Sequence, residues 1–310
     1  MNLIYPLSQR SNRVDFLISL LAGLLTVTAP LFGLGFSSRA DAGPVQQANN
    51  PANNQSKSRI CALGLVENFP RIQLAASKPP FIPKRHVRIT FVGHSTMMIE
   101  SPQGVSLATD YNGYNRTSFR PDIVTMNNSH ETHYTDFIDP KIQFVLRGWD
   151  PNGGIARHDL KIKDLRVYNV PTNFAVWEGR KINENSIFII ETAQLCLAHV
   201  GHLHHVLTDN QTLKVGRIDV LFIPIDGTYT MSYEEVAKVI ARVRPKLVIP
   251  MHFFGLEEGN MFIKTLKTPY PVKHLKKTSL LMSRKDLPKS TEIWFLREQM
   301  LGSFGFGGEE

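Results

Sequence analysis

The sequence contains only two cysteines, Cys61 and Cys196, among its 310 residues. Neither has a second cysteine nearby, which argues against a zinc site built on cysteine. Cys196 falls in an apolar segment, where a cysteine is most often a small buried side chain. The alternative is a single disulfide between the two, which would form if the protein is exported to an oxidising compartment.

Acidic residues are also few. The chain has 27 acidic and 35 basic residues, a formal charge of +8. Part of the excess gathers near the C-terminus, at Lys264, Lys267, Lys273, Lys276, Lys277, Arg284, Lys285 and Lys289. A solvated basic face is the simpler interpretation, and attraction to anionic substrates or lipid headgroups is the alternative. No recognised nucleic-acid-binding motif accompanies the charge, so nucleic acid is disfavoured as a partner.

The first 42 residues have the features of a secretory signal peptide. Arg10 and Arg13 precede an apolar run from Phe16 to Phe36, and Ala40-Asp41-Ala42 forms an A-x-A cleavage site. The apolar run is nearly long enough to span a membrane, so an uncleaved anchor that gives membrane contact is the alternative. We therefore predict a periplasmic or secreted protein.

Residues 43–58 are rich in Asn, Gln and Pro and predict a flexible linker. The folded domain is predicted over residues 59–300, followed by a tail at 301–310.

Alternating apolar runs and turns predict strands near residues 87–92, 97–100, 105–108, 122–126, 144–147, 165–170, 185–191, 195–198, 219–224, 247–250 and 291–296. Residues 171–177 would be a connection, and 148–154 a loop suited to a pocket rim. Residues 209–216 predict a short helix. Ser232 and Glu235 form a capping box for a second helix, with an apolar stripe from Val236 to Val243 that ends before Pro245.

Histidines follow several of the predicted strands. His130 and His133 come after residues 122–126, His199 and His202 after 195–198, and His252 after 247–250. Neutral imidazole is the commonest protein ligand for metal ions. The pattern therefore predicts a metal site assembled from loops at the ends of strands.

The motifs in this order resemble the metallo-β-lactamase superfamily, in its lactonase-like and phospholipase-D-like branch. They are Gly93-His94-Ser95, a strand ending in Asp110, Asn128-Ser129-His130-Glu131-Thr132-His133, His199-Val200-Gly201-His202, Pro224-Ile225-Asp226-Gly227 and Pro250-Met251-His252. The resemblance covers roughly residues 85–285. It implies an α/β fold, a four-layer αββα sandwich, and a metal-dependent hydrolase with His130, His133, His199 and His252 as ligands.

Three positions depart from the family pattern. Asn128 stands in place of the first histidine of the motif, Thr132 in place of its aspartate, and His202 in place of the bridging aspartate. Two dications held by neutral imidazoles without carboxylates would repel each other strongly. We therefore expect one ion, zinc or another divalent metal, rather than two. His202 would be a further ligand or a general base, and Asp226 would supply a compensating carboxylate.

Four further residues lie near the predicted ligands in the sequence, namely His94, Asp110, His204 and His205. A lone histidine such as His94 is more often structural than functional, although it could line the mouth of the site. Asp110 is expected to orient a metal-binding imidazole. His204 and His205 are expected to face solvent or the helix behind.

These features predict an exported hydrolase in which a metal-bound hydroxide attacks an ester, lactone or phosphodiester. The substrate would be a small or lipid-like molecule, and an anionic one is the alternative that the basic charge leaves open. A catalytically inactive metal- or ligand-binding protein on the same scaffold is the alternative, because both carboxylates are missing. Nothing in the sequence indicates an oligomeric state.

Overall fold

The computed structural model describes residues 81–176 and 179–299. The predicted leader, linker and tail, and Cys61, lie outside these ranges. Within them, no helix is both long and apolar enough to cross a membrane.

Two sheets make up the fold. The first has six strands in the order β13-β1-β2-β3-β4-β5. Their bounds are β1 His86–Gly93, β2 Thr96–Glu100, β3 Ser106–Ala108, β4 Ile123–Met126, β5 Phe144–Arg147 and β13 Ser279–Ser283. The predicted turn between β2 and β3 is present, since the Gly104 amide donates to the Ser101 carbonyl at 3.0 Å.

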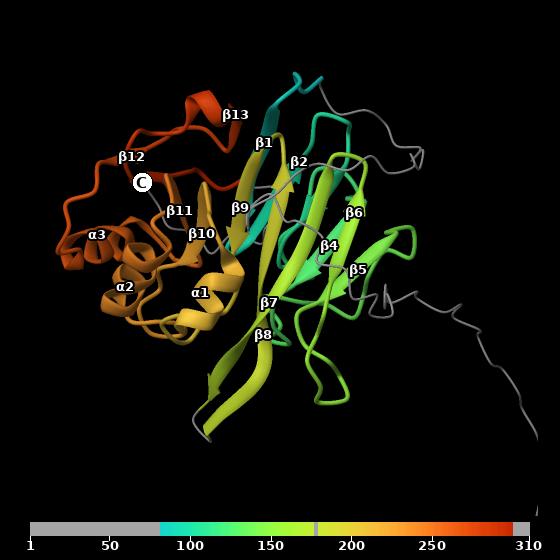
Figure 1. Ribbon diagram of the computed structural model, residues 1–310, viewed down its shortest axis with the longest axis horizontal. Helices are drawn as coiled ribbons and strands as arrows, with labels where there is room; N and C mark the ends of the chain where they lie inside the picture. The colour runs from blue at the N-terminus through green and yellow to red at the C-terminus, as the bar shows by residue number, and fades with distance from the viewer. Residues whose placement is uncertain (1–80, 177–178, 300–310) are drawn as a thin grey trace, which may run out of the picture. The chain divides into compact units, whose positions relative to one another are not determined.

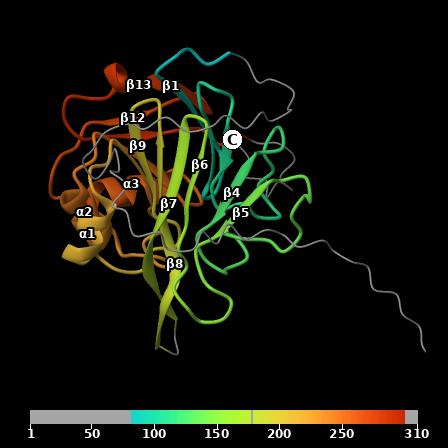
Figure 2. The same ribbon diagram turned by 45° about the vertical axis from the view of Figure 1, so that its right-hand side comes forward.

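The second sheet has eight strands in the order β12-β14-β11-β10-β9-β8-β7-β6. Their bounds are β6 Asp159–Ile162, β7 Leu165–Val176, β8 Gly179–Thr192, β9 Leu195–His199, β10 Val220–Pro224, β11 Leu247–Met251, β12 Val272–His274 and β14 Glu292–Phe295. Strands β9, β10 and β11 run parallel to one another, and β7 and β8 form a long antiparallel hairpin (Figure 2).

Three α-helices follow β9: α1 Asp209–Val215, α2 Tyr233–Val243 and α3 Leu256–Thr265. They lie on one side of β9–β11, and the six-stranded sheet lies on the other (Figures 1 and 2). A single 3-10 turn, Arg284–Asp286, follows β13. The predicted capping box of α2 is present, with Ser232 Oγ accepting from the Glu235 amide. Val236, Val239 and Ile240 are buried against the sheet, as the stripe predicted.

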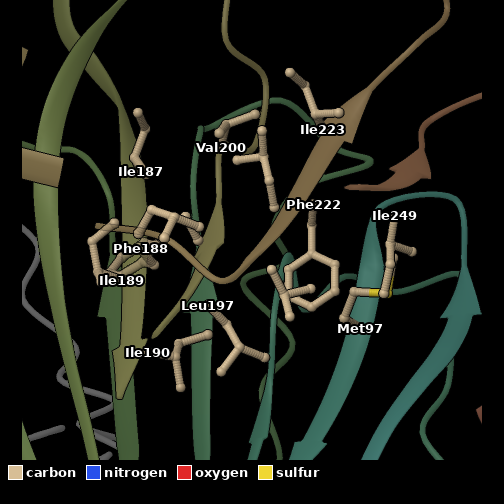
Figure 3. Close-up of a cluster of buried hydrophobic side chains, with 14 of the residues drawn as sticks. Met97, Ile187, Phe188, Ile189, Ile190, Leu197, Val200, Phe222, Ile223 and Ile249 are labelled. Atoms are coloured by element: carbon tan, nitrogen blue, oxygen red, sulfur yellow. The ribbon is translucent and has the colours of Figure 1, made fainter. Parts of the chain in front are cut away.

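The main core fills the space between the sheets. Alternate residues of β1 and β2, such as Ile89, Phe91 and Met97, point into it from the first sheet. Strands β9, β10 and β11 are buried on both faces, as is β8 from Asn185 to Thr192, and they contribute apolar runs. Figure 3 shows Met97 of β2 close to Phe222 of β10 and Ile249 of β11, which joins the two sheets through side-chain packing.

The opposite face of the six-stranded sheet has a smaller core. Residues of alternate register, including Met98, Val124 and Val145, form this second cluster. Loop side chains cover it, namely Tyr111, Phe119, Tyr134, Ile138 and Trp149. The loop that carries His130 and His133 is therefore tied to the sheet by apolar packing.

Two segments differ from the expectation. Residues 171–176 continue β7 instead of forming a connection, because their backbone pairs with β8 across a register shift near Thr172. Helix α3 and the edge strands β12 and β13 were not predicted, since β12 spans only three residues and α3 contains Gly259. The lysines between Lys264 and Lys289 lie at exposed positions, which agrees with the interpretation as a solvated basic face.

Gly201 allows its backbone to approach the side chain of Asn127 closely. Its φ is +58°, and a Cβ there would lie 2.2 Å from Cβ of Asn127. Asn127 is fully buried, and its Nδ2 donates to the carbonyls of Ser186 at 2.6 Å and His199 at 3.1 Å. The Asn127 side chain therefore cannot move away from an added Cβ without breaking these hydrogen bonds.

We expect Gly201→Ala to lower the free energy of unfolding by about 3 kcal/mol, from left-handed strain plus overpacking. Gly153→Ala is the matched control, because its φ is +81° but no atom lies within 4 Å of the added Cβ. It should cost only the strain, about 1 kcal/mol. Urea denaturation followed by circular dichroism measures both, and equal losses would contradict the packing argument.

Candidate metal centre

Loops after the strands bring six histidines together at one edge of the sheets. They are His94 after β1, His130 and His133 after β4, His202 and His204 after β9, and His252 after β11. Since β9 and β11 flank β10 in parallel, their carboxyl ends open on the same edge, where α/β proteins usually place sites. Neighbouring ring centroids are between 4.0 and 6.0 Å apart.

His133 is the most constrained of these rings. It is fully buried, and its Nδ1 donates to Oδ2 of Asp110 at 2.5 Å. The other nitrogen, Nε2, is buried and has no hydrogen-bond partner. Burial, and then the rings of His252 and His130, lower the pKa of His133 well below its ordinary value. The ring is therefore neutral, with its lone pair on Nε2.

Asp110 has the orienting role that the sequence predicted. Its Oδ1 accepts from the Asn127 amide at 2.9 Å, so the carboxylate is fixed at both oxygens. Burial raises its pKa to about 6, although His199, the Asn127 amide and Ser95 act in the opposite direction. A histidine held in this way presents one defined nitrogen to a metal ion.

His94 and His252 form a second tight pair. Their ring centroids are 4.0 Å apart, and the His252 amide donates to the His94 carbonyl at 2.7 Å. Nε2 of His94 and Nδ1 of His252 are both buried without a hydrogen-bond partner. Burial, followed by His252 and His133, lowers the pKa of His94 to about 2, so this ring is neutral as well.

Asp226 supplies the negative charge nearest to this pair. Its Oδ2 lies 3.1 Å from Nδ1 of His252, but not in the direction of a hydrogen bond. Its Oδ1 accepts from the amides of Thr228, Tyr229 and Thr230. Although burial acts to raise it, His252 and these donors hold the pKa of Asp226 well below its ordinary value, and the group is ionised.

The loop after β4 shows what the replaced motif residues do. Asn128 Oδ1 accepts from the His130 amide at 2.8 Å, and its Nδ2 donates to the Glu184 carbonyl at 2.6 Å. Asn128 therefore ties the loop to β8. The Thr132 hydroxyl lies 3.0 Å from Nδ1 of His130, an exposed ring.

His202 has a partner that we did not expect. Its Nδ1 lies 2.6 Å from Nε2 of His204, so one ring donates to the other. The expectation that His204 faces solvent or the helix was wrong, because the turn after Gly201 brings the two rings to a centroid distance of 4.7 Å. Burial is the main cause that lowers the pKa of both rings, that of His204 to about 4.

His199 lies apart from the others. Its Nε2 donates to the Ser95 carbonyl at 2.7 Å, and Oδ2 of Asp110 is 3.9 Å away. Its Nδ1 is buried without a hydrogen-bond partner. This nitrogen does not converge with those of the other histidines, so the ring faces the loop after β1 in this structure.

Within the described residues, two histidine groups could hold an ion. One is His94, His133 and His252, and the other is His130, His133 and His202, with ligand nitrogens within 4.8 Å of one another in each. Four of the predicted residues are thus brought together, and His94 joins them. Imidazoles with buried nitrogens that have no hydrogen-bond partner are costly unless something binds them. Their chemistry fits a divalent ion such as zinc, which takes nitrogen ligands at about 2.0–2.1 Å.

Sequence reasoning gave His94 and His204 too little weight. The signal for His94 was the Gly-His-Ser motif itself, in which a histidine follows a strand end as the other site residues do. For His204 the only signal was the number of histidines between residues 199 and 205. That signal does not show whether a histidine bonds another histidine or lies at the surface.

Comparisons with known proteins agree with this architecture. Residues 88–252 match the family model described as beta-lactamase superfamily domain. A UPF0173 metal-dependent hydrolase of Carboxydothermus hydrogenoformans is 23% identical over 193 residues, covering 54% of this chain and 84% of the relative. A second, from Pyrococcus furiosus, is 24% identical over 191 residues with the same coverage.

Among solved structures, a protein of the metallo-beta-lactamase superfamily from Thermotoga maritima superposes with a TM-score of 0.51. It is 23% identical and covers 69% of this chain and 100% of its own. At this identity the similarity shows the fold alone, and it confirms the predicted fold class.

We expect Asp110→Asn to weaken binding of a divalent ion by about 10–100-fold. The amide would present a donor to Nδ1 of His133, which moves the ring proton to Nε2 and removes the lone pair from the cluster. Asp164→Asn is the control, since Asp164 accepts only from Ser101 and Gln103 at the surface turn. Competition titration with a chelator measures both, and an unchanged affinity in Asp110→Asn would contradict the tautomer assignment.

Proposed function

This chain belongs to the β-lactamase superfamily, and from that premise we propose that it is a metal-dependent hydrolase of an ester, lactone or phosphodiester. The observation that carries the proposal is the convergence of buried imidazole nitrogens that have no hydrogen-bond partner, on His94, His133 and His252. We propose that one divalent ion binds there or in the overlapping group, with zinc preferred because every ligand is nitrogen.

A bound ion would supply an acidified water molecule and a positive charge next to the substrate's carbonyl or phosphoryl oxygen. The chain's own residues have separate tasks. Asp110 keeps His133 in one tautomer and orientation. His202, coupled to His204, is a nitrogen base at the inner wall that can accept a proton and pass it outward. Thr132, which stands in place of the aspartate of the motif, has no basic group. The His202–His204 pair would therefore carry out the proton transfer.

Asp226 contributes charge and position in this proposal. Its carboxylate is ionised and lies against His252, so it offsets part of the positive charge of an ion. Its bonds to the amides of residues 228–230 also fix the loop that carries Tyr229.

Exposed aromatic rings flank the histidines and favour a substrate with an apolar group. Phe254 is 68% exposed, and its ring lies 5.7 Å from that of His94 and 6.3 Å from that of His252. Tyr229, 66% exposed, meets Phe254 edge to face at 6.4 Å. Large exposed rings beside a polar cleft commonly bind ligands. We propose that they hold the acyl or lipid-like part of the substrate.

A basic pocket next to the site favours an anionic group on the substrate. It has a volume of about 510 Å³ and is lined by Lys276, Lys277, Thr278, Ser279, Arg297, Glu298 and Gln299. Glu298 connects it to the centre, because its Oε1 accepts from the His94 amide at 3.0 Å. Positive charge close to the site raises the local concentration of anionic substrates.

We propose an exported enzyme, periplasmic or secreted, with membrane anchoring through an uncleaved leader as the alternative. The leader pattern of residues 1–42 supports this. Cys196 is disulfide-bonded, which supports an oxidising compartment, while Cys61, the chain's other cysteine, lies outside the described residues.

A metal- or ligand-binding protein without catalytic activity is the second proposal. The structural use of Asn128 favours it, because a ligand position of the family has become a loop tie between His130 and Glu184. Such a protein would keep the ion and lose turnover.

We expect the purified protein to contain one equivalent of a divalent metal and to hydrolyse ester or phosphodiester substrates. His133→Ala should lose both, because both histidine groups include its Nε2. His86→Ala, a histidine at the start of β1 whose ring contacts the Lys84 carbonyl, should retain both. Metal analysis and initial rates are the measurements, with thermal unfolding as a check of folding. Metal bound without turnover in wild type would favour the second proposal.

We expect Phe254→Ala to raise KM about tenfold for substrates with a long acyl chain, because it removes roughly 1–2 kcal/mol of apolar contact. The kcat should stay within about threefold, because no reacting group is lost. Leu281→Ala is the control, since Leu281 is an exposed apolar residue that pairs with Arg88, far along β1 from His94. A fall in kcat with unchanged KM would contradict a substrate-binding role for Phe254.

A further inference from the structure

The two histidine groups share one atom. Each contains His133, and only Nε2 of that ring is free, because Nδ1 is bonded to Asp110. An imidazole nitrogen has one lone pair and binds one ion. The two groups therefore cannot both act as three-ligand sites at the same time, and the structure must favour one of them.

The hydrogen bonds differ between the groups. In His94, His133 and His252, each ring has a buried nitrogen with no hydrogen-bond partner. In the other group, Nδ1 of His130 is paired with the Thr132 hydroxyl and Nδ1 of His202 with His204, so each ring offers Nε2, but neither has a buried nitrogen without a hydrogen-bond partner. A buried nitrogen without a partner carries a cost that only a ligand removes. His158 and His199 also have such a nitrogen, but neither converges with two others.

Burial also favours the group of His94, His133 and His252. His133 and His252 are 0% and 3% exposed, and His94 is half-buried, whereas His130 is an exposed ring. Charge–dipole and coordinate interactions are strongest where water is excluded. The ionised carboxylate of Asp226 also lies on the side of His252, 3.1 Å from its ring. The first group therefore has the drier surroundings and the nearer negative charge.

The backbone supports the same group. His94 and His252 both have left-handed backbone, with φ of 51° and 53°, and so does Asp110, at 41°. This conformation is unusual for residues other than glycine and asparagine, and it persists where the surroundings enforce it, often at functional sites. The bond from the His252 amide to the His94 carbonyl locks the two turns together.

We propose that the resident ion is held by His94, His133 and His252, with His94 as a ligand outside the set of His130, His133, His199 and His252 that the resemblance implied. His130, an exposed ring, then stands on the open side, where substrate and water enter, and the buried His202 lies at the inner wall. This inference rests on the proposed function, because it assigns the ligands of the same ion. The lost ligand at Asn128 is replaced from the loop after β1, which explains how three edited positions are compatible with metal binding.

The test compares metal affinity among variants, independently of turnover. Asparagine removes the imidazole and tolerates left-handed backbone, so His94→Asn and His252→Asn preserve the local fold. His130→Asn and His202→Asn are the matched variants of the other group, and His86→Asn is the control outside both. Zinc affinity is measured by competition with a chelator, and cobalt substitution reports coordination through its visible absorption. Thermal unfolding of each metal-free variant checks folding.

We expect His94→Asn and His252→Asn to lose more than about 100-fold in zinc affinity, beyond the 10–100-fold range of outer partners. Both should also lose the absorption of four-coordinate cobalt. His130→Asn and His202→Asn should stay within about tenfold of wild type, and His86→Asn should be unchanged. His94→Cys, which restores a zinc ligand at that position, should recover part of the affinity.

Three results would overturn the assignment. The first is a His94→Asn variant that binds zinc as wild type does while His130→Asn or His202→Asn loses the ion. The second is a large loss in all four variants, which would mean that one ion draws on both groups. The third is two equivalents of zinc at similar affinity in wild type. Failure of wild type to bind any divalent ion is a different outcome, which refutes the proposed function itself.

Discussion

The bond between Asp110 and His133 is the interaction on which the rest of the site depends. It fixes Nδ1 of His133 as a donor and leaves Nε2 as the single free lone pair at the centre of the cluster. The same carboxylate accepts from the Asn127 amide, and Asn127 in turn bonds the carbonyls of Ser186 and His199. One buried network therefore connects β3, β4, β8 and β9 and sets the direction of one ring nitrogen.

In the proposed function, this constraint would let the centre bind an ion with few acidic side chains. Burial keeps His94 and His133 neutral, and the repulsion within the cluster would increase if either were protonated. A single dication with three neutral ligands and one adjacent carboxylate, Asp226, avoids the repulsion of two close ions. The edits at Asn128, Thr132 and His202 are then parts of one change, in which the acidic motif is replaced by histidines and by Asp226 on the neighbouring loop.

Much of the fold could be predicted from the sequence. The strands of the main core have continuous or alternating apolar runs, and the Ser232 capping box with its stripe predicted α2 correctly. The edge strands β12 and β13 and helix α3 escaped prediction, because β12 has only three residues and α3 contains Gly259. The extended part of β7 was missed because Pro171 and Asn173 suggest a turn, whereas pairing with β8 determines the conformation.

The sequence predicted most of the residues of the site, but not how their rings are oriented. Strand ends and motif order identified His130, His133, His202 and His252, which the structure brings together. Sequence could not show that His199 turns its Nε2 to the Ser95 carbonyl, or that His204 bonds His202, because both depend on turns whose direction is set by tertiary contacts. The role of His94 depends on a left-handed turn and a bond to the loop of His252, and neither leaves a pattern in the sequence.

We propose that one ion sits among these buried imidazoles, and an anomalous difference map at the metal absorption edge would show whether it does. The account predicts a single peak at about 2.0–2.1 Å from nitrogens of His94, His133 and His252. Two peaks of similar height, or a single peak whose ligands exclude His133, would contradict it.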